Sequence, residues 1–374
     1  MIIKFNDLFK EHSLIKKSLG GKLDTLFKNS DYINGKEVKL FEENLKKLTK
    51  SKFAISCGNG TDALQISLMS LNLKRNDEVI MPAFSYISII ETVVLLGLKP
   101  VLVDVNYDTF LINEKEIENK ITSKTRVIVP VHLFGQNCYM EKIKKIANKY
   151  SLFIIEDSAQ SIASNYNFKN KKIQSGNIGD LGCFSFFPTK NMGCYGDGGA
   201  IITNNSNLFE RISMIKNHGQ KQKYKHDLVG VNSRLDTFQA CVLNSKFQVL
   251  DKSNSLRKRN AKHYYSFLKD AKGIILPKRV DYSDHIYHQF TIKVKNNKRD
   301  FIKNELQQIG IPTIIYYPFT MNSHKAYQKY FKKNKNYHVS KLLCNEVLSL
   351  PIHPYLNKNN IKFISNKIIK ILND

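Results

Sequence analysis

The sequence predicts an α/β domain with a largely parallel sheet, followed by a smaller α+β domain. In the first half of the chain, short apolar segments alternate with amphipathic helical segments. This alternation is typical of parallel sheets covered by helices. From about residue 245 onward, a long helical segment leads into shorter strands and two further helices. We therefore place a large domain at 1–245 and a small domain at 246–374.

Each predicted strand of the large domain is a short apolar run, and several of these runs end in a polar or glycine-containing turn. The predicted strands span residues 78–81, 100–105, 127–131, 153–156, 183–187 and 200–203. Apolar residues spaced three and four apart predict helices at 63–70 and 140–149. In the small domain we expect helices at 246–269, 299–310 and 361–372, and a strand at 288–294. Because ligands of open α/β sheets bind beyond the carboxyl ends of strands, the turns after these strands are the expected site.

Length and composition indicate an ordinary globular protein. The 374 residues suffice for two domains, and 42% apolar with 24% charged residues exclude disorder, collagen and coiled coil. No apolar run approaches the roughly 20 residues that span a bilayer, and the first residues resemble no secretory signal. The six cysteines show neither a C-x-x-C pair nor zinc-ligand spacing. We expect reduced, mostly buried thiols, no metal site, no membrane partner and a cytoplasmic protein.

The net charge of +26 raises the alternative of a nucleic-acid-binding or non-catalytic regulatory protein. Only eight of the 58 basic residues are arginine, the residue type that base readout and bidentate phosphate contact favour. The lysines are spread along the whole chain, so we predict no nucleic-acid partner, although the positive field can attract an anionic small molecule. Nucleic-acid binding driven by charge would weaken steeply as the salt concentration rises, and this dependence would distinguish a nucleic-acid-binding protein from an enzyme.

A glycine-rich turn at 57–64 is the first candidate for chemistry. Thr61 and Asp62 stand where the predicted helix begins, and such a turn offers backbone N–H groups and a positive helix end to a phosphate. The turn matches neither the Walker pattern nor G-x-G-x-x-G, so ATP and NAD find no support. Taken alone, it is also typical of an ordinary capped turn.

The segment 154–161 places Asp157 at the end of an apolar strand. A carboxylate there stays ionised only beside a cation or hydrogen-bond donors, and a protonated ring nitrogen is one such partner. A helix N-cap explains the same octamer equally well.

The third candidate is Lys190, which follows the predicted strand 183–187 and precedes a glycine-rich loop. Desolvation at the end of a buried strand lowers the pKa of a lysine, which suits Schiff-base chemistry. The glycines allow the backbone to approach a bulky planar ligand closely.

With the three motifs in this order, the chain resembles the DegT/StrS family of sugar aminotransferases, which use pyridoxal 5′-phosphate (PLP). The most specific segments are 58–64, 156–161, 185–199 and 230–236, and the resemblance extends from Gly35 to Pro351. It implies the fold type I architecture, with a mixed, mostly parallel seven-stranded sheet and a small C-terminal domain. It also implies a homodimer with active sites at the subunit interface.

The resemblance assigns roles to individual residues. Lys190 corresponds to the lysine that binds PLP covalently, Asp157 to the acid that pairs with the pyridinium nitrogen, and Gln160 to the residue facing the 3-hydroxyl. Thr61, Asp62 and Ser185 correspond to phosphate ligands, Tyr86 to the aromatic residue stacked on the ring, and Asn232 to a phosphate ligand from the neighbouring subunit. An ordinary core tyrosine is the alternative for Tyr86.

The family also contains dehydratases, which carry a histidine where this chain has Lys190, so the resemblance favours amino transfer from L-glutamate. The segments 55–66 and 217–220 look most like the branch that aminates C3 of UDP-2-acetamido-2-deoxy-3-oxo-glucuronate for surface polysaccharide biosynthesis, including lipopolysaccharide or O-antigen. Alternatives are a 3-aminotransferase of a dTDP-3-keto-6-deoxyhexose and a 4-aminotransferase of a 4-keto sugar.

Four residues are candidates for the sugar side of the site: Arg234, Tyr316, Tyr317 and Asn322. The loop 316–322 departs from the usual His-Tyr-Pro-x-Pro-Leu-His at three positions, including Tyr316 and Asn322. Arg234 would reach an acid group of the substrate, and an ion pair with Asp236 is the alternative.

Overall fold

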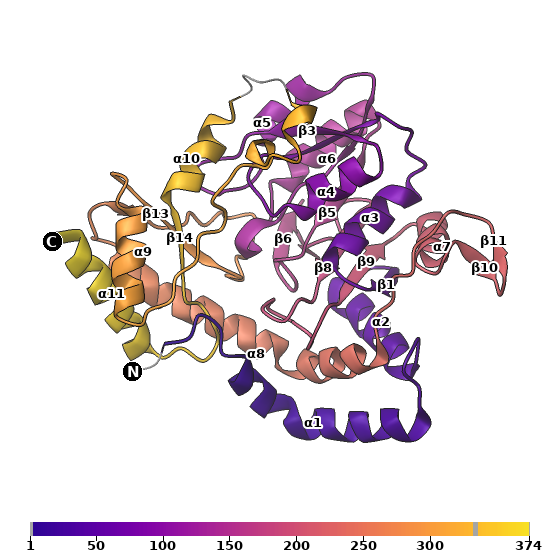
Figure 1. The fold of residues 1–374 in the computed structure, drawn as a ribbon, viewed down its shortest axis with the longest axis horizontal. Helices are drawn as coiled ribbons and strands as arrows, with labels where there is room; N and C mark the ends of the chain where they lie inside the picture. The colour runs from indigo at the N-terminus through magenta and orange to yellow at the C-terminus, as the bar shows by residue number, and fades with distance from the viewer. Residues whose placement is uncertain (1–2, 332–335, 374) are drawn as a thin grey trace.

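A seven-stranded sheet forms the centre of the computed structural model, which describes residues 3–331 and 336–373 (Figure 1). Its strands are β1 (Phe53–Cys57), β2 (Glu78–Pro82), β3 (Lys99–Val103), β4 (Thr125–Ile128), β5 (Phe153–Asp157), β8 (Leu181–Ser185) and β9 (Gly199–Thr203). The order across the sheet is β1-β9-β8-β5-β4-β2-β3. Strand β9 runs antiparallel to both neighbours, and every other pair is parallel. The predicted mixed, mostly parallel seven-stranded sheet is confirmed.

Six of these strands coincide with the predicted ones within a few residues, whereas β1 was not predicted. Strand β1 lies at the edge of the sheet, and its hydrogen-bond partner is β9, far along the chain. Its short sequence, which begins after a lysine-rich helix and ends in a glycine turn, carries little periodicity of its own.

Helices cover both faces of the sheet (Figure 1). They are α1 (Leu8–Asn29), α2 (Lys36–Thr49), α3 (Gly60–Ser70), α4 (Ser88–Leu95), α6 (Met140–Tyr150), α7 (Ser206–Ile215) and α8 (Thr237–Leu268). Because side chains of a strand alternate between faces, Ile201 of β9 joins the cluster with α3, α4 and α7, while Ile202 joins the cluster with α1, α2 and α8. Short pieces complete the large domain: α5 (Glu114–Ile117) and two hairpins, β6 (Asn165–Phe168) with β7 (Lys171–Gln174) and β10 (Gln220–Gln222) with β11 (Lys225–His226).

A three-stranded antiparallel sheet and its helices form the C-terminal part. The elements are β12 (Ile274–Ile275), β13 (Phe290–Val294), β14 (Val347–Leu350), α9 (Arg299–Gln308), α10 (His338–Glu346) and α11 (Lys358–Asn373). Helix α8 connects the two parts, since Leu243 belongs to the core under the large sheet and Tyr264 to the core of the small one. The proposed division between 245 and 246 therefore lies inside α8, and the predicted helix start at 246 was wrong by nine residues, because 237–245 continue the same helix.

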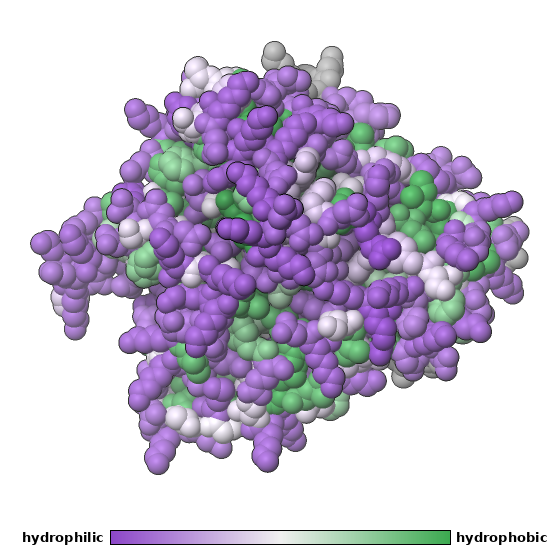
Figure 2. Space-filling view, turned by 180° about the vertical axis from the view of Figure 1, so that it is seen from behind, coloured by the Kyte–Doolittle hydropathy of each residue, from purple (hydrophilic) through white to green (hydrophobic). Residues whose placement is uncertain are grey.

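The exterior is dominated by hydrophilic side chains, with apolar ones in scattered patches on the face that Figure 2 shows. All six cysteines are free and buried, as predicted. Within the described residues, no helix is long and apolar enough to cross a membrane.

Replacing Phe41 by alanine tests the packing of α2. Phe41 is fully buried and meets Phe186 edge-on, with 5.2 Å between ring centroids. We expect Phe41→Ala to reduce the free energy of unfolding by about 3–5 kcal/mol, since it leaves a cavity. Phe9→Ala is the matched control, because Phe9 is 73% exposed. Equal shifts of the two denaturation midpoints would contradict this account of the core.

Candidate active site

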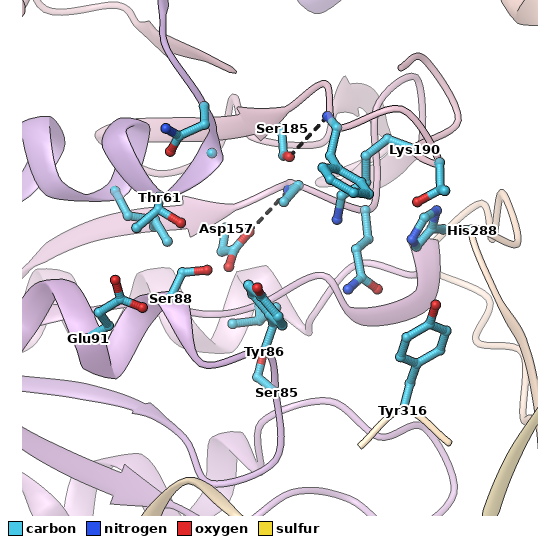
Figure 3. A pocket seen from close by; sticks show the side chains of 18 of the residues that line it. Thr61, Ser85, Tyr86, Ser88, Glu91, Asp157, Ser185, Lys190, His288 and Tyr316 are labelled. Carbon is cyan, nitrogen blue, oxygen red and sulfur yellow. Dashed lines mark hydrogen bonds between the residues drawn. The ribbon is translucent and has the colours of Figure 1, made fainter. Parts of the chain in front are cut away.

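A cavity of about 800 Å³ opens where four strands of the large sheet end. The first turn of α3, which follows β1, supplies Thr61, and the turn after β2 supplies Tyr86. The carboxyl ends of β5 and β8 supply Asp157 and Ser185. Figure 3 shows these side chains converging on one space, with Lys190 and His288 on its far side. Nine predicted residues line the cavity: Thr61, Asp62, Tyr86, Asp157, Gln160, Ser185, Lys190, Tyr316 and Tyr317. The cavity therefore lies where the sequence predicted the site, beyond the carboxyl ends of the strands.

Three predicted residues lie outside this cavity. Asn232 is exposed, and its backbone pairs with Asn217. Arg234 lines a separate surface depression together with Lys216, and none of the ion pairs among described residues joins it to Asp236. Asn322 stands in a short 3₁₀ turn, and its Oδ1 atom is buried without a hydrogen-bond partner in the described structure. None of these three residues lines the cavity of a single chain.

The N-terminus of α3 forms one wall of the cavity. Asn59 caps the helix, since its Oδ1 accepts a hydrogen bond from the N–H of Asp62 at 2.8 Å. The N–H groups of Gly60 and Thr61 keep no partner among the described residues and lie at the positive end of the helix. A Cβ atom at Gly60 would stand 2.6 Å from the Cβ of Ser185. The turn therefore offers space and N–H donors to an anion, and any side chain at residue 60 would fill that space.

Asp62 lines the cavity, but its carboxylate is engaged elsewhere. Its Oδ2 accepts a hydrogen bond from the Ser233 hydroxyl at 2.6 Å, and the Ser233 hydroxyl in turn accepts from the N–H of Gly58 at 2.9 Å. The side chain thus ties residue 233 to the turn between β1 and α3. With its N–H capped by Asn59 as well, Asp62 offers the cavity no free donor.

Asp157 stands at the end of β5 with its carboxylate at the cavity. Its Oδ1 accepts from the N–H of Ala159 at 3.1 Å, and burial raises the pKa of Asp157, opposed by this hydrogen bond and by the charge of Lys190. No helix begins at this point in the described structure, so the alternative of a helix N-cap was wrong.

Lys190 lies in the loop after β8, and its backbone N–H closes a turn onto the carbonyl of Phe187. Burial lowers the pKa of Lys190 to about 8, and the negative charge of Asp157 opposes this shift. A substantial fraction of the amine is therefore neutral near physiological pH and able to act as a nucleophile.

Both polar atoms of the Gln160 side-chain amide form hydrogen bonds. Its Oε1 accepts from the N–H of Phe134 at 2.7 Å, and its Nε2 donates to the hydroxyl of Tyr317 at 3.1 Å. The ring of Tyr317 also lies 6.1 Å from that of Tyr86, between centroids. Tyr317, which was expected on the sugar side, therefore contacts the residues assigned to the cofactor. Tyr86 is 57% exposed, which excludes the alternative of an ordinary core tyrosine.

Several lining residues were missed by the sequence predictions, notably His288, Gln289, Ser88 and Glu91. His288 is buried, its Nδ1 contacts Oδ1 of Asn191 at 3.2 Å, and burial lowers the pKa of His288 well below its usual value. His288 and Gln289 gave only a weak signal in the sequence, since two polar residues before an apolar strand have no characteristic pattern. Only the fold brings His288 beside Lys190.

The chain matches the model of the DegT/DnrJ/EryC1/StrS aminotransferase family over residues 14–369. It is 38% identical to the pleiotropic regulatory protein of Geobacillus stearothermophilus over 98% of each chain. It is 39% identical to the UDP-2-acetamido-2-deoxy-3-oxo-D-glucuronate aminotransferase of Pseudomonas aeruginosa, over 97% of this chain and 98% of the relative.

A third relative, the dTDP-3-amino-3,6-dideoxy-alpha-D-galactopyranose transaminase of Aneurinibacillus thermoaerophilus, is 37% identical over 96% of this chain and 97% of its own. Among solved structures, S. venezuelae DesV in complex with a ketimine intermediate superposes with a TM-score of 0.95 at 32% identity, covering 100% of this chain and 99% of the other.

Asp157→Asn tests the electrostatics of the site in the protein without cofactor. Because the Asp157 carboxylate raises the pKa of Lys190, its removal lowers that pKa further, and the pH midpoint for labelling of Lys190 by an acylating reagent moves to lower pH. Peptide mass spectrometry after labelling across a pH series measures the midpoint. Glu91→Gln is the control, since Glu91 lines the same cavity but is not among the charges that act on Lys190. An unchanged or higher midpoint in Asp157→Asn would contradict the prediction.

Proposed function

The chain belongs to the DegT/DnrJ/EryC1/StrS aminotransferase family, and we propose that it moves an amino group from L-glutamate to a nucleotide-linked keto sugar. Membership confirms the predicted enzyme class, a PLP-dependent aminotransferase, and the sugar transaminases among its relatives confirm the predicted family. The observation that carries amino transfer is Lys190, a partly buried lysine with a lowered pKa on the wall of the same cavity as Asp157.

The residues present fit PLP. The free N–H groups of Gly60 and Thr61 and the hydroxyl of Ser185 would hold its phosphate, and Asp157 would hold its ring nitrogen in the protonated state. Gln160, already fixed by Phe134, would face the 3-hydroxyl. When bound, PLP supplies an electron-accepting ring that carries the amino group between donor and acceptor.

The chain's own residues then perform the proton chemistry. With PLP bound, the amine of Lys190 would take a proton from the substrate carbon and return it, and a pKa of about 8 suits a group that must do both. His288 is neutral, so it adds no positive charge beside Lys190.

We propose C3 of UDP-2-acetamido-2-deoxy-3-oxo-glucuronate as the acceptor, for surface polysaccharide synthesis in the cytoplasm. The whole-length similarity to the Pseudomonas aeruginosa enzyme supports this choice. A dTDP-linked 3-keto-6-deoxyhexose is the second candidate, supported by similarity to the Aneurinibacillus enzyme. The similarity to the regulatory protein from Geobacillus supports a second class of function, a non-catalytic regulator. A regulator, however, has no need for Lys190, Asp157 and Gln160 in one cavity.

We also propose a homodimer that shares its active sites, and the charges of the cavity support this assembly. Among the described residues, the lining contains four carboxylates and one cation, although the proposed cofactor and nucleotide sugar carry phosphate groups. The carboxylates belong to Asp62, Glu91, Asp157 and Asp197, and the cation is Lys190. Asn232 is exposed, and Arg234 has no ion-pair partner in the described part of the chain. Both lie outside the cavity of their own chain, where a second copy of the chain would contact them.

Gly60→Ala tests the phosphate cradle. The added methyl group would meet Ser185 and push apart the two walls that hold the phosphate, so we expect the affinity for PLP to fall at least tenfold. Gly21→Ala in α1 is the control, because a Cβ there meets nothing within 4 Å and leaves PLP affinity unchanged. Titration of the cofactor-free proteins with PLP, followed by absorbance, measures both. Equal affinities would exclude this turn as the phosphate site.

The proposed reaction is tested by the visible absorption spectrum of the protein with PLP, before and after L-glutamate. We expect a band from the Lys190–PLP adduct that glutamate bleaches, and no such band in Lys190→Ala. The glutamate-treated protein is then mixed with UDP- and dTDP-linked 3-keto and 4-keto sugars, and return of the band identifies the acceptor. A band that glutamate leaves unchanged would refute the proposed donor, and return of the band with a dTDP sugar alone would replace the UDP assignment.

A further inference from the structure

We propose that Glu156 is a positioning residue, which holds Asp157 at the cavity by tying the end of β5 to the segment 175–179. This inference rests on the proposed role of Asp157 toward the cofactor. Glu156 does not line the cavity and touches none of the reacting groups. Its action is on the backbone that carries its neighbour.

The carboxylate of Glu156 is completely buried and fully engaged with this segment. Its Oε1 accepts hydrogen bonds from the N–H of Ile178, at 2.6 Å, and from that of Gly179. Its Oε2 accepts from the N–H of Gly176 at 3.1 Å. Hydrogen bonds from N–H groups to an ionised carboxylate are stronger than neutral ones, so three of them make a rigid clamp.

His132 completes the clamp from the next strand of the sheet. Its Nδ1 accepts from the N–H of Cys138 at 3.1 Å, which leaves the proton on Nε2, and Nε2 donates to Oε2 of Glu156 at 2.8 Å. Both side chains are fully buried. The clamp therefore joins the extension of β4, the end of β5 and the segment 175–179.

Ser158, which follows Asp157, is anchored to the same segment 175–179. The hydroxyl of Ser158 lies 3.3 Å from that of Ser175, which also bonds to Ser161. Because successive side chains of an extended chain point to opposite sides, anchoring 156 and 158 on one side directs Asp157 to the other, toward the cavity. Figure 3 shows Asp157 facing this space.

The segment can come this close only because of its glycines. At Gly176, which has φ of +87°, a Cβ atom would stand 2.9 Å from the ring of Phe184 and 3.0 Å from the Ser158 hydroxyl. At Gly179 it would stand 2.8 Å from the carbonyl oxygen of Ile154. The backbone of segment 175–179 therefore packs directly against β5 and β8. A displacement of this segment would move residues 156 and 158, and with them Asp157.

Glu156→Gln tests the proposal, since it keeps the shape of the side chain but removes the charge that the three N–H groups share. We expect the affinity for PLP to fall about tenfold. In the protein without cofactor, the pH midpoint for acylation of Lys190 should move to lower pH, as in Asp157→Asn, because the carboxylate of Asp157 is no longer held near the amine. Hydrogen exchange of the segment 175–179 should become faster.

Asp104→Asn is the matched control. Asp104 is also a carboxylate anchor, which accepts from the N–H groups of Val339 and Ser340, but it lies outside the cavity. We expect it to lower the melting temperature without changing PLP affinity or the Lys190 midpoint. If Glu156→Gln behaves in the same way as Asp104→Asn, Glu156 only stabilises the fold and the proposal is overturned.

If Glu156→Gln does not fold, Ser175→Ala tests the proposal through the contact between Ser158 and Ser175. We expect the affinity for PLP to fall about threefold, and an unchanged affinity would refute the proposal. Failure of the wild-type protein to bind PLP would overturn the proposed function instead. The Lys190 midpoint requires no cofactor and would still decide whether Glu156 positions Asp157.

Discussion

The site depends on one electrostatic arrangement, an amine and a carboxylate that are both partly buried and share a cavity. Burial alone lowers the pKa of Lys190 and raises that of Asp157, and each charge opposes the shift of the other. Each charge therefore favours the charged form of the other group against the cost of burial. The parallel strands, whose carboxyl ends meet at one edge of the sheet, bring β5 and β8 together to place them.

Much of the fold was predictable, because six of the seven sheet strands are apolar runs with their own turns. Strand β1 escaped prediction, since its partner β9 is distant in sequence and its edge position imposes little pattern. The start of α8 at Thr237 was missed for a related reason: residues 237–245 are buried by tertiary contacts on several sides and show no single apolar face. Periodicity reports local burial, and it fails where burial is set by distant segments.

Most residues assigned to the cofactor were expected at the cavity because the resemblance rests on continuous motifs, whereas Asn232 lies outside it. His288 and Glu91 were not, since they reach the cavity from a linker and a helix that share no motif with it. Asp62 and Tyr317 illustrate a further limit. Their place at the cavity was expected, but only the structure shows that one binds Ser233 and the other Gln160.

The two ends of the cavity differ in how firmly their residues are held. Asp157 and Gln160 bond to the backbone of neighbouring turns, whereas Ser88 and Glu91 have no side-chain partner among the described residues, and Tyr86 is largely exposed. Fixed groups suit chemistry that is the same for every acceptor, because reorganisation during the reaction is costly. Unengaged groups suit recognition, since their hydrogen-bonding capacity remains for a ligand.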